Sequence, residues 1–199
     1  KMDDVKVTER NGRYEYETLL DGIDEKYSLD FHSPYGCSKG AADQYVRDYN
    51  RIYGLKTIVL RQSCIYGTRQ FSIEDQGWIA WFVIASILKR PITIYGDGKQ
   101  GRDILWIDDL VDVYVKLYEN ADKVAGEVFN VGGGSSNILS ILELIEYLKD
   151  YGIMKEAPAF SHWRPGDQKI FVCNINKVKE AAHWTPTITP KAGIEKLIK

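Results

Sequence analysis

Tyr35 and Lys39 stand four residues apart, just after Ser33-Pro34. In a helix this spacing places both side chains on one face. A phenol with an ordinary pKa of about 10 is a poor base at neutral pH. A cation held close to it favours the phenolate and lowers that pKa, so the phenol can exchange a proton with a substrate hydroxyl. The pair therefore predicts acid–base chemistry on an alcohol, provided that its helix forms.

The same spacing occurs at Tyr95/Lys99 and at Tyr151/Lys155. The first of these pairs runs through Gly96-Asp97-Gly98, and the second lies where a helix is expected to end, so neither is predicted on a continuous helix. On spacing alone, an exposed Tyr–Lys contact without function explains such a pair at least as well as catalysis does. The elements around each pair must therefore decide between catalysis and an exposed contact without function.

The segment that carries the first pair has clear helix signals. Ser33 suits the N-cap, Pro34 suits the first helical position, and Gly54 suits the C-terminal end. Between these signals, apolar and aromatic residues recur at three- and four-residue steps, which predicts one buried face. The recurring residues are Tyr35, Ala42, Tyr45, Val46, Tyr49 and Tyr53.

The rest of the chain alternates between helix and strand patterns, which predicts an α/β fold. Residues 1–30 are charged and rich in turn formers, and they predict a loop with a short hairpin. Thr57–Leu60 predicts a strand covered on both faces, and Arg61–Asp75 a polar loop. Further strands are predicted over Pro91–Tyr95, Glu127–Val131 and Lys169–Cys173, and helices over Gln76–Leu88, Asp108–Asn120, Ile138–Asp150, Asn176–Ala182 and after Pro190.

Bulk properties limit the partners. The chain has 199 residues, 44% of them hydrophobic, which suits one domain or one large piece of a two-lobed enzyme. A net charge of −2 argues against nucleic acid or an anionic membrane as a partner. The longest apolar stretch, Trp78–Leu88, is too short to span a bilayer. Cys37, Cys64 and Cys173 are odd in number and scattered, so we expect no disulfide framework, no metal site and a cytoplasmic location.

The segment from Ser33 to Lys39, Ser-Pro-Tyr-Gly-Cys-Ser-Lys, resembles the catalytic helix of the extended short-chain dehydrogenase/reductases. This family includes nucleotide-sugar epimerases and dehydratases, and the resemblance covers nearly everything after residue 30. It implies a Rossmann-type α/β fold that binds NAD, together with a small mixed α/β substrate-binding lobe. The other matching motifs, in the family's order, are Leu60–Gly67, Gly96–Asp103 with Asp108-Asp109, Gly126–Gly132, Arg164–Asp167 and Trp184–Pro186.

Phe31–Tyr45, Tyr66–Phe71 and Asp75–Trp78 are similar to one branch of the family, which converts CDP-paratose to CDP-tyvelose. This similarity implies epimerisation at C2 of a CDP-dideoxyhexose through a transient 2-keto sugar, with tightly held NAD that is regenerated in each cycle. Two alternatives stay open. The chain could belong to a 4-epimerase or 4,6-dehydratase acting on another nucleotide sugar, or it could by itself be a non-catalytic fragment that binds a nucleotide sugar.

The resemblance assigns roles to individual residues. Tyr35 would carry the proton, and Lys39 would bind the nicotinamide ribose and tune Tyr35, so both would also contact the cofactor. Arg102 and Arg164 would hold the substrate diphosphate, because a guanidinium can bind phosphate oxygens in a bidentate manner. Asp167 would orient the nucleotide ribose. Alternatively, each arginine could merely pair with a neighbouring carboxylate, Asp103 or Asp167.

The loop after the second strand supplies three further substrate-site candidates. Arg69 and Gln70 lie where the family's loop faces the sugar. Cys64 stands where many relatives place an asparagine that contacts the diphosphate. A cysteine is only a weak donor, so that contact would be weaker here.

The family's dinucleotide-binding fingerprint has no match. Gly132–Asn137 follows a predicted strand but lacks the third glycine of G-x-G-x-x-G, and it resembles the family's late glycine loop rather than a cofactor cradle. The Ser or Thr that shares the substrate hydroxyl with the tyrosine has no counterpart in residues 1–30. We therefore expect a C-terminal portion of the enzyme that is incomplete and inactive by itself.

Residues 1–75 are expected to form the C-terminal part of the Rossmann-type NAD domain, including the catalytic helix. Residues 76–199 are expected to form mainly the nucleotide-sugar-binding lobe, with 104–131 returning to the core sheet. The expected partner is a nucleotide-diphosphate sugar. Relatives commonly dimerise through the helix that carries the Tyr–Lys pair, so a homo-oligomer is expected of the complete enzyme.

Overall fold

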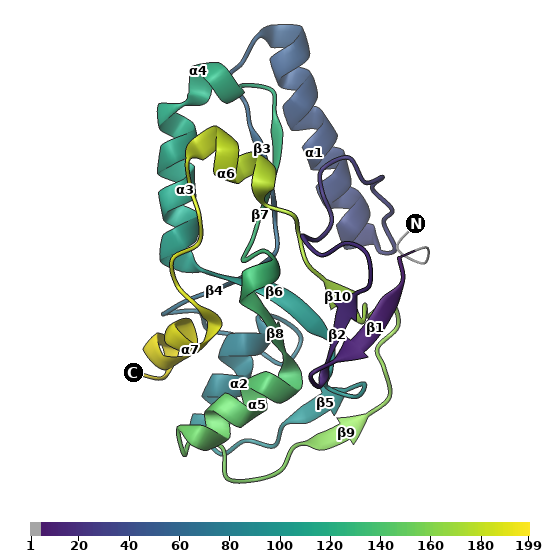
Figure 1. The fold of residues 1–199 in the computed structure, drawn as a ribbon, viewed down its shortest axis with the longest axis vertical. Coiled ribbons are helices and arrows are strands. Elements are labelled where there is room, and N and C mark those ends of the chain that lie inside the picture. The colour runs from purple at the N-terminus through teal and green to yellow at the C-terminus, as the bar shows by residue number, and fades with distance from the viewer. Residues whose placement is uncertain (1–4) are drawn as a thin grey trace.

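A computed structural model describes residues 5–199, so the first four residues of the unit expected over residues 1–75 lie outside the described part. The elements form two groups along the long axis of the molecule (Figure 1). In the upper group, the parallel strands β3 (Val59–Gln62) and β7 (Val128–Val131) lie between α1 (Pro34–Tyr53) and α3 (Ile107–Glu119). The short helices α4 (Ala121–Val124) and α6 (Asn176–Ala182) complete it.

The lower group is built around β6 (Gly101–Trp106). The first part of β6 pairs in parallel with β10 (Ile170–Phe171) and antiparallel with β8 (Ile138–Ser140), and its second part pairs in parallel with β4 (Cys64–Tyr66). The other elements of the group are α2 (Trp78–Ile87), α5 (Ile141–Asp150), α7 (Pro190–Ile198), and the parallel pair β5 (Thr93–Tyr95) and β9 (Ala159–Ser161). The mixture of helices and parallel strands confirms the α/β prediction.

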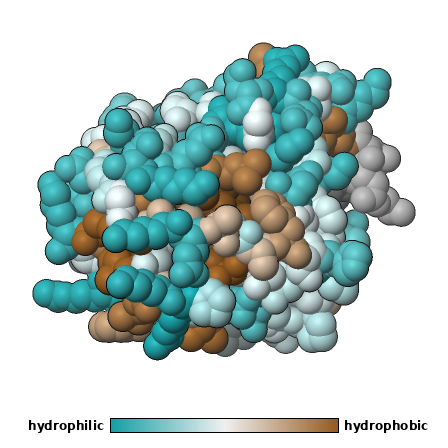
Figure 2. Space-filling model, turned by 90° about the horizontal axis from the view of Figure 1, so that it is seen from below, coloured by the Kyte–Doolittle hydropathy of each residue, from teal (hydrophilic) through white to brown (hydrophobic). Residues whose placement is uncertain are grey.

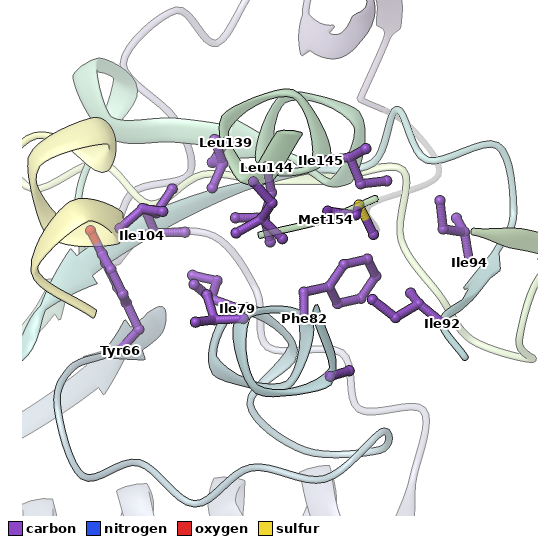
Figure 3. Packing of buried hydrophobic residues seen from close by; sticks show 14 of the residues in the cluster. Tyr66, Ile79, Phe82, Ile92, Ile94, Ile104, Leu139, Leu144, Ile145 and Met154 are labelled. Carbon is purple, nitrogen blue, oxygen red and sulfur yellow. The ribbon is translucent and has the colours of Figure 1, made fainter. Parts of the chain in front are cut away.

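Each of the two groups has its own large apolar core. The lower core lies between α2 and α5, and Figure 3 shows residues such as Phe82 and Leu144 pointing toward each other from these helices. The upper core contains Phe129 of β7 and Leu117 of α3. Trp184 is buried in the upper core, and its indole donates to the Asp109 carbonyl oxygen at 3.1 Å. The Trp-Thr-Pro motif therefore has a packing role.

Helix α1 has the predicted ends but not the predicted buried face. The Ser33 hydroxyl accepts from the Gly36 amide, and Gly54 ends the helix in a left-handed conformation. However, the aromatic residues at helical spacing are exposed, and only Gly40 and Asp43 of this helix are buried. The prediction of a buried face was wrong because, in residues 5–199, the short strand β3 is the main element against which α1 packs.

Three other predictions need correction. The segment taken as a polar loop after Leu60 contains the end of β3 and all of β4, because pairing with β7 and β6 outweighs its polarity. Ile138–Ser140 is a strand, and the predicted helix begins only after Ser140, where a capping box forms with Glu143. Two strands were missed. The central strand β6 was taken as part of the connection before α3, and all three residues of β9 are exposed.

The predicted hairpin near the N-terminus is confirmed. It consists of β1 (Val7–Arg10) and β2 (Arg13–Tyr16), joined by Asn11-Gly12 with positive φ at both residues. Such a two-residue turn matches the twist of antiparallel strands. The hairpin packs beside β6 and β10.

The end of the molecule formed by α2 and α5 carries apolar side chains between hydrophilic ones (Figure 2). Ile87 and Leu88, where α2 ends, are both exposed. Within residues 5–199, the longest apolar helix falls short of what crossing a bilayer requires.

Candidate active site

Four of the predicted substrate-site residues line one cavity of about 240 Å3 in the lower group. Cys64 comes from β4, Arg102 from β6, and Arg164 and Asp167 from the segment between β9 and β10. These residues are far apart in the sequence, and only the folding of the lobe brings them together. Aromatic side chains form much of the remaining wall: Trp78, Trp81, Phe82 and Tyr95.

The Arg102 guanidinium is held by neighbouring backbone oxygens. It donates to the carbonyl oxygens of Gly101 and Gln168, each at 2.8 Å. The Asp167 carboxylate lies 3.6 Å from Nη2. The arginine is therefore oriented before any ligand arrives, and its charge is only partly offset by Asp167.

Arg164 lies against the face of Tyr95, with Cζ 3.9 Å from the ring centroid. Its Nη2 is 2.9 Å from Oδ1 of Asp75, a residue that is mostly exposed. Stacking on an aromatic face restricts a guanidinium while leaving its edge free to donate. The alternative of simple ion pairs thus applies in part, since both arginines have a carboxylate neighbour, Asp167 or Asp75.

Asp103 pairs with neither arginine. It is fully buried, and its carboxylate accepts hydrogen bonds from the Ser63 hydroxyl, from the Gly134 amide at 3.2 Å and from the Cys173 thiol at 3.0 Å. Burial raises the pKa of Asp103, although these hydrogen bonds oppose that shift. Asp103 thus ties β6 to the glycine loop and to the residues after β10.

The glycine loop of residues 132–134 packs against this buried carboxylate. A Cβ atom at Gly132 would collide with Asp103 and with the Cys173 sulfur, and one at Gly133 would collide with the Ile104 carbonyl oxygen. Close packing against the protein interior therefore explains the glycines, in agreement with a late structural loop rather than a cofactor cradle.

Cys64 belongs to the cavity wall, and burial raises the pKa of its thiol, an effect that the nearby Trp78 indole partly opposes. The thiol therefore stays neutral at physiological pH. As a neutral, weak donor it can contact an anionic ligand without competing with the arginines for it.

The Tyr–Lys pair lies on a second, larger cavity of about 730 Å3 beside α1 and β3. Lys39 Nζ lies 5.4 Å from the centroid of the Tyr35 ring, so the two side chains share one face of the helix. The Tyr35 side chain is 72% exposed. The spacing that acid–base chemistry needs is therefore present, in an open setting.

Asp43, one helical turn after Lys39, fixes this part of α1 to the sheet. Its carboxylate is 2.7 Å from Nε of Arg61 on β3, and it is almost completely buried. Arg61 also donates to the Glu25 carbonyl oxygen at 3.4 Å. Sequence reasoning missed this ion pair, because its two partners lie on different elements and no spacing along the chain links them.

Adjacent residues of one segment line the two cavities. Asp167 lines the smaller cavity and Gln168 the larger one. Arg102, which lines the smaller cavity, donates to the Gln168 carbonyl oxygen. A residue of the smaller cavity is therefore hydrogen-bonded to a residue of the larger one.

Arg69 and Gln70 are not brought into either cavity. Arg69 is exposed with a positive φ of 65°, and the Gln70 amide donates to the Ile65 carbonyl oxygen at 3.5 Å. Conversely, sequence reasoning missed Trp81, Tyr95 and Gln100 as wall residues. The signal for them was their position within a family motif, for Gln100, or close to one, for Trp81 and Tyr95.

The residues around the Tyr–Lys pair fit one end of NAD. The Lys39 ammonium is exposed at the larger cavity and, among residues 5–199, forms no ion pair, so its donors are free for ribose hydroxyls. Gly40, directly after it, is buried against Phe31, whose ring fills the place of any larger side chain. No group of acidic, histidine and cysteine side chains in the described part of the chain could hold a metal ion.

Comparisons with known proteins identify the family of the chain. Residues 15–132 match the model of the NAD dependent epimerase/dehydratase family. CDP-paratose 2-epimerase of Salmonella typhi is 43% identical over 201 residues, covering 98% of this chain and 60% of that protein. The chain thus spans well under two thirds of the length of this curated relative.

Two solved structures share the fold. UDP-glucose 4-epimerase of Thermotoga maritima with UDP-glucose has a TM-score of 0.80 at 29% identity, covering 89% of this chain and 56% of that one. UDP-glucuronic acid 4-epimerase of Bacillus cereus, in complex with UDP-glucuronic acid and NAD, also has a TM-score of 0.80 at 29% identity, covering 89% and 55%. With a family model that matches more than half of its residues, the chain belongs to the NAD dependent epimerase/dehydratase family.

Proposed function

We propose that this chain is the catalytic and substrate-binding portion of an NAD-dependent enzyme that inverts C2 of a CDP-dideoxyhexose, converting CDP-paratose to CDP-tyvelose. The observation that carries the proposal is the convergence of Arg102 and Arg164 in one aromatic-walled cavity. Two guanidinium groups suit a diphosphate, and aromatic walls suit a nucleobase. The similarity to CDP-paratose 2-epimerase supports the choice of nucleotide and of reacting carbon.

In this proposal the smaller cavity holds the nucleoside diphosphate. Arg102 and Arg164 bind the phosphate oxygens, Cys64 contacts them from the wall, and Asp167 orients the nucleotide ribose. The sugar then extends past residues 167–168 toward the larger cavity. Arg69 and Gln70 would meet the sugar only if their loop closes over it.

At the larger cavity, Tyr35 takes the proton from the C2 hydroxyl and later returns it. Lys39 holds the nicotinamide ribose and keeps a positive charge beside the phenol, which favours the phenolate. When bound, NAD supplies the acceptor and then the donor of the hydride. The 2-keto sugar must turn between the two halves of the reaction, and the open setting of Tyr35 leaves room for this movement.

We propose that the chain is divided between these two roles. Residues up to 75 carry the catalytic helix of the NAD domain, residues 76–199 form mainly the nucleotide-sugar lobe, and 104–131 return to the core sheet. The parallel pairing of β7 with β3 supports that return. A homo-oligomer that covers the exposed aromatic face of α1 also belongs to this proposal. Three unpaired cysteines support a reducing compartment such as the cytoplasm.

The deciding experiment supplies the complete enzyme with CDP-paratose and follows the configuration at C2 by NMR. We expect equilibration with CDP-tyvelose without a net change in the NADH signal. UDP-glucose and dTDP-glucose, substrates named for other relatives, serve as comparison substrates. Inversion at C4, loss of water from the sugar, or no reaction with CDP-paratose would reject the proposal.

The isolated 199-residue chain provides a second test. We expect it to bind CDP but not NAD, because the glycine-rich fingerprint is missing from its sequence. Calorimetric titration with each ligand measures this difference. Tight binding of NAD would show that these residues hold the cofactor without that fingerprint.

A further inference from the structure

The β1–β2 hairpin is hydrogen-bonded to a turn beside the proposed nucleotide site, residues Gly96–Lys99 between β5 and β6. Three hydrogen bonds link the hairpin to this turn. The Tyr14 hydroxyl donates to Oδ2 of Asp97 at 2.6 Å, and the Tyr14 amide donates to the Lys99 carbonyl oxygen at 3.0 Å. Lys99 Nζ lies 2.8 Å from Oε1 of Glu9. The hairpin therefore clamps the turn from both backbone and side chains.

The same turn sets the cavity wall. Tyr95 precedes the turn and stacks on Arg164, whereas Gln100 and Arg102 follow it, and all four residues line the smaller cavity. The turn has a left-handed backbone at Gly96 and Gly98, with φ of 93° and 78°. A small shift of this turn would therefore move cavity residues that precede the turn as well as cavity residues that follow it.

Asp97 is the residue that joins the turn to the hairpin. Its Oδ1 accepts from the Lys99 amide at 3.0 Å, which closes the turn, while its Oδ2 accepts from Tyr14. The hydrogen bond to Asp97 raises the pKa of Tyr14 to about 12, so the hydroxyl stays a donor at physiological pH. The turn is thus closed and attached to the hairpin by one carboxylate.

The two sequence comparisons include different parts of the hairpin. The match to the general family begins only at residue 15, so it leaves out β1 and Tyr14. The similarity to the Salmonella CDP-paratose 2-epimerase covers 98% of this chain and leaves out only a few residues. The region similar to that enzyme therefore includes the hairpin, whereas the family match includes only residues 15 and 16 of it.

We propose that Tyr14 is a positioning residue of the nucleoside-diphosphate site, acting through Asp97 on the turn that carries Tyr95 and Arg102. The hairpin holds the turn in its binding geometry, so ligand binding does not have to supply the free energy of ordering the turn. This inference rests on the proposed nucleotide-sugar function. It adds a role for residues that lie outside the cavity and touch no substrate.

The test is the affinity of the complete enzyme for CDP, measured by calorimetry, together with kcat and KM. Tyr14→Phe keeps the ring and removes only the hydroxyl. We expect CDP affinity to fall about three- to tenfold, as for a partly transmitted loss of one hydrogen bond to a charged group, with kcat changed less than about twofold. KM should rise with the dissociation constant.

Thr189→Ala is the matched control. It removes the N-cap hydrogen bond of α7, in which the Ala192 amide donates to the Thr189 hydroxyl at 3.3 Å. The change therefore lowers stability without affecting the turn. Its CDP affinity should equal that of the wild type. If Thr189→Ala weakens CDP binding as much as Tyr14→Phe does, the effect is general destabilisation and the inference is wrong.

A double-mutant cycle with Arg102→Ala separates positioning from a merely structural role. If Tyr14 acts through the turn, Tyr14→Phe should have little further effect once Arg102 is absent; strict additivity would overturn the inference. Should Tyr14→Phe fold poorly, Glu9→Gln loosens the same turn from the hairpin tip and should weaken CDP binding in the same direction. If the wild type binds CDP and both variants bind it with the same affinity, the inference is wrong but the proposed function stands. If the wild type does not bind CDP, the proposed function is wrong as well.

Discussion

The two cavities hold their functional side chains in opposite ways. In the smaller cavity, Arg102 is fixed by two backbone oxygens and Arg164 by the Tyr95 ring, all within one packed lobe. In the larger cavity, Tyr35 projects from an exposed helix that is tied to the sheet mainly through Asp43. Neighbouring atoms therefore orient the two arginines within the described residues, whereas the Tyr–Lys pair has its spacing but little enclosure.

This difference has a chemical reason. Arginines that bind a diphosphate must be oriented before the ligand arrives, because ordering long side chains on binding costs affinity. Proton exchange by a phenol also needs a setting in which water is excluded. The lobe provides the first condition by itself. The second depends on what lies over Tyr35 when substrate and NAD are bound.

The largest expected effect comes from Tyr35→Phe in the complete enzyme. Removal of the proton carrier should lower kcat by about 10²- to 10⁴-fold, the usual contribution of general acid–base catalysis. CDP affinity should stay within about twofold, because the smaller cavity is intact. Tyr151→Phe is the matched control, since Tyr151 also precedes a lysine by four residues but lies at the end of α5. A kcat close to that of the wild type would remove Tyr35 from the mechanism.

Arg164→Ala should affect the smaller cavity, and it should change the affinity for CDP rather than kcat. Loss of a charge-assisted contact of about 1.5–3 kcal/mol would weaken CDP binding by roughly 10- to 100-fold, with little change in kcat at saturation. Arg164→Lys should recover only part of the affinity, because it keeps the charge but not the planar fork. Arg90→Ala, at an exposed arginine, is the control. An unchanged dissociation constant would show that Arg164 does not bind the diphosphate.

Asp43→Ala tests how α1 is anchored. Removing the buried partner of Arg61 should lower the free energy of unfolding by about 1–3 kcal/mol, less than for a fully buried pair because Arg61 is 21% exposed. Urea denaturation measures the change. Asp48→Ala on the same helix, which breaks an exposed pair with Arg51, should cost less than about 0.5 kcal/mol. Equal effects of the two variants would mean that Asp43 does not anchor the helix.

The smallest expected effect is on the pH dependence of stability. Burial raises the pKa of Asp103, so the folded state holds its proton more tightly than the unfolded state. The contribution of this group to stability is then fully present below its unfolded pKa of about 4 and is lost as pH rises through the folded pKa.

Asp103→Asn should remove that pH-dependent term. Nδ2 could donate to the Ser63 hydroxyl while Oδ1 accepts from the Gly134 amide, so the hydrogen bonds can persist. We expect the wild type to lose stability relative to Asp103→Asn as pH rises above about 4, as measured by urea midpoints. A difference that is constant over this range would show that Asp103 is ionised in both states with the same pKa.

The sequence by itself determined the local features. Ser33, Pro34 and Gly54 specify the ends of α1, because capping and φ preferences act within one turn of the chain. The same holds for the Asn11-Gly12 hairpin. The ordered motifs indicated the family and four residues of the smaller cavity, although Arg69 and Gln70 remain predictions that the observed cavities do not include.

The tertiary structure decided what depends on distant partners. Periodicity could not show that the aromatic face of α1 lies exposed, since a pattern records which residues share a face but not what covers it. No local rule links Asp43 to Arg61, Tyr14 to Asp97, or Arg102 to the Gln168 carbonyl. Such contacts join segments that meet only when the sheets and helices pack, because hydrogen bonds and ion pairs depend on atomic positions rather than on sequence spacing.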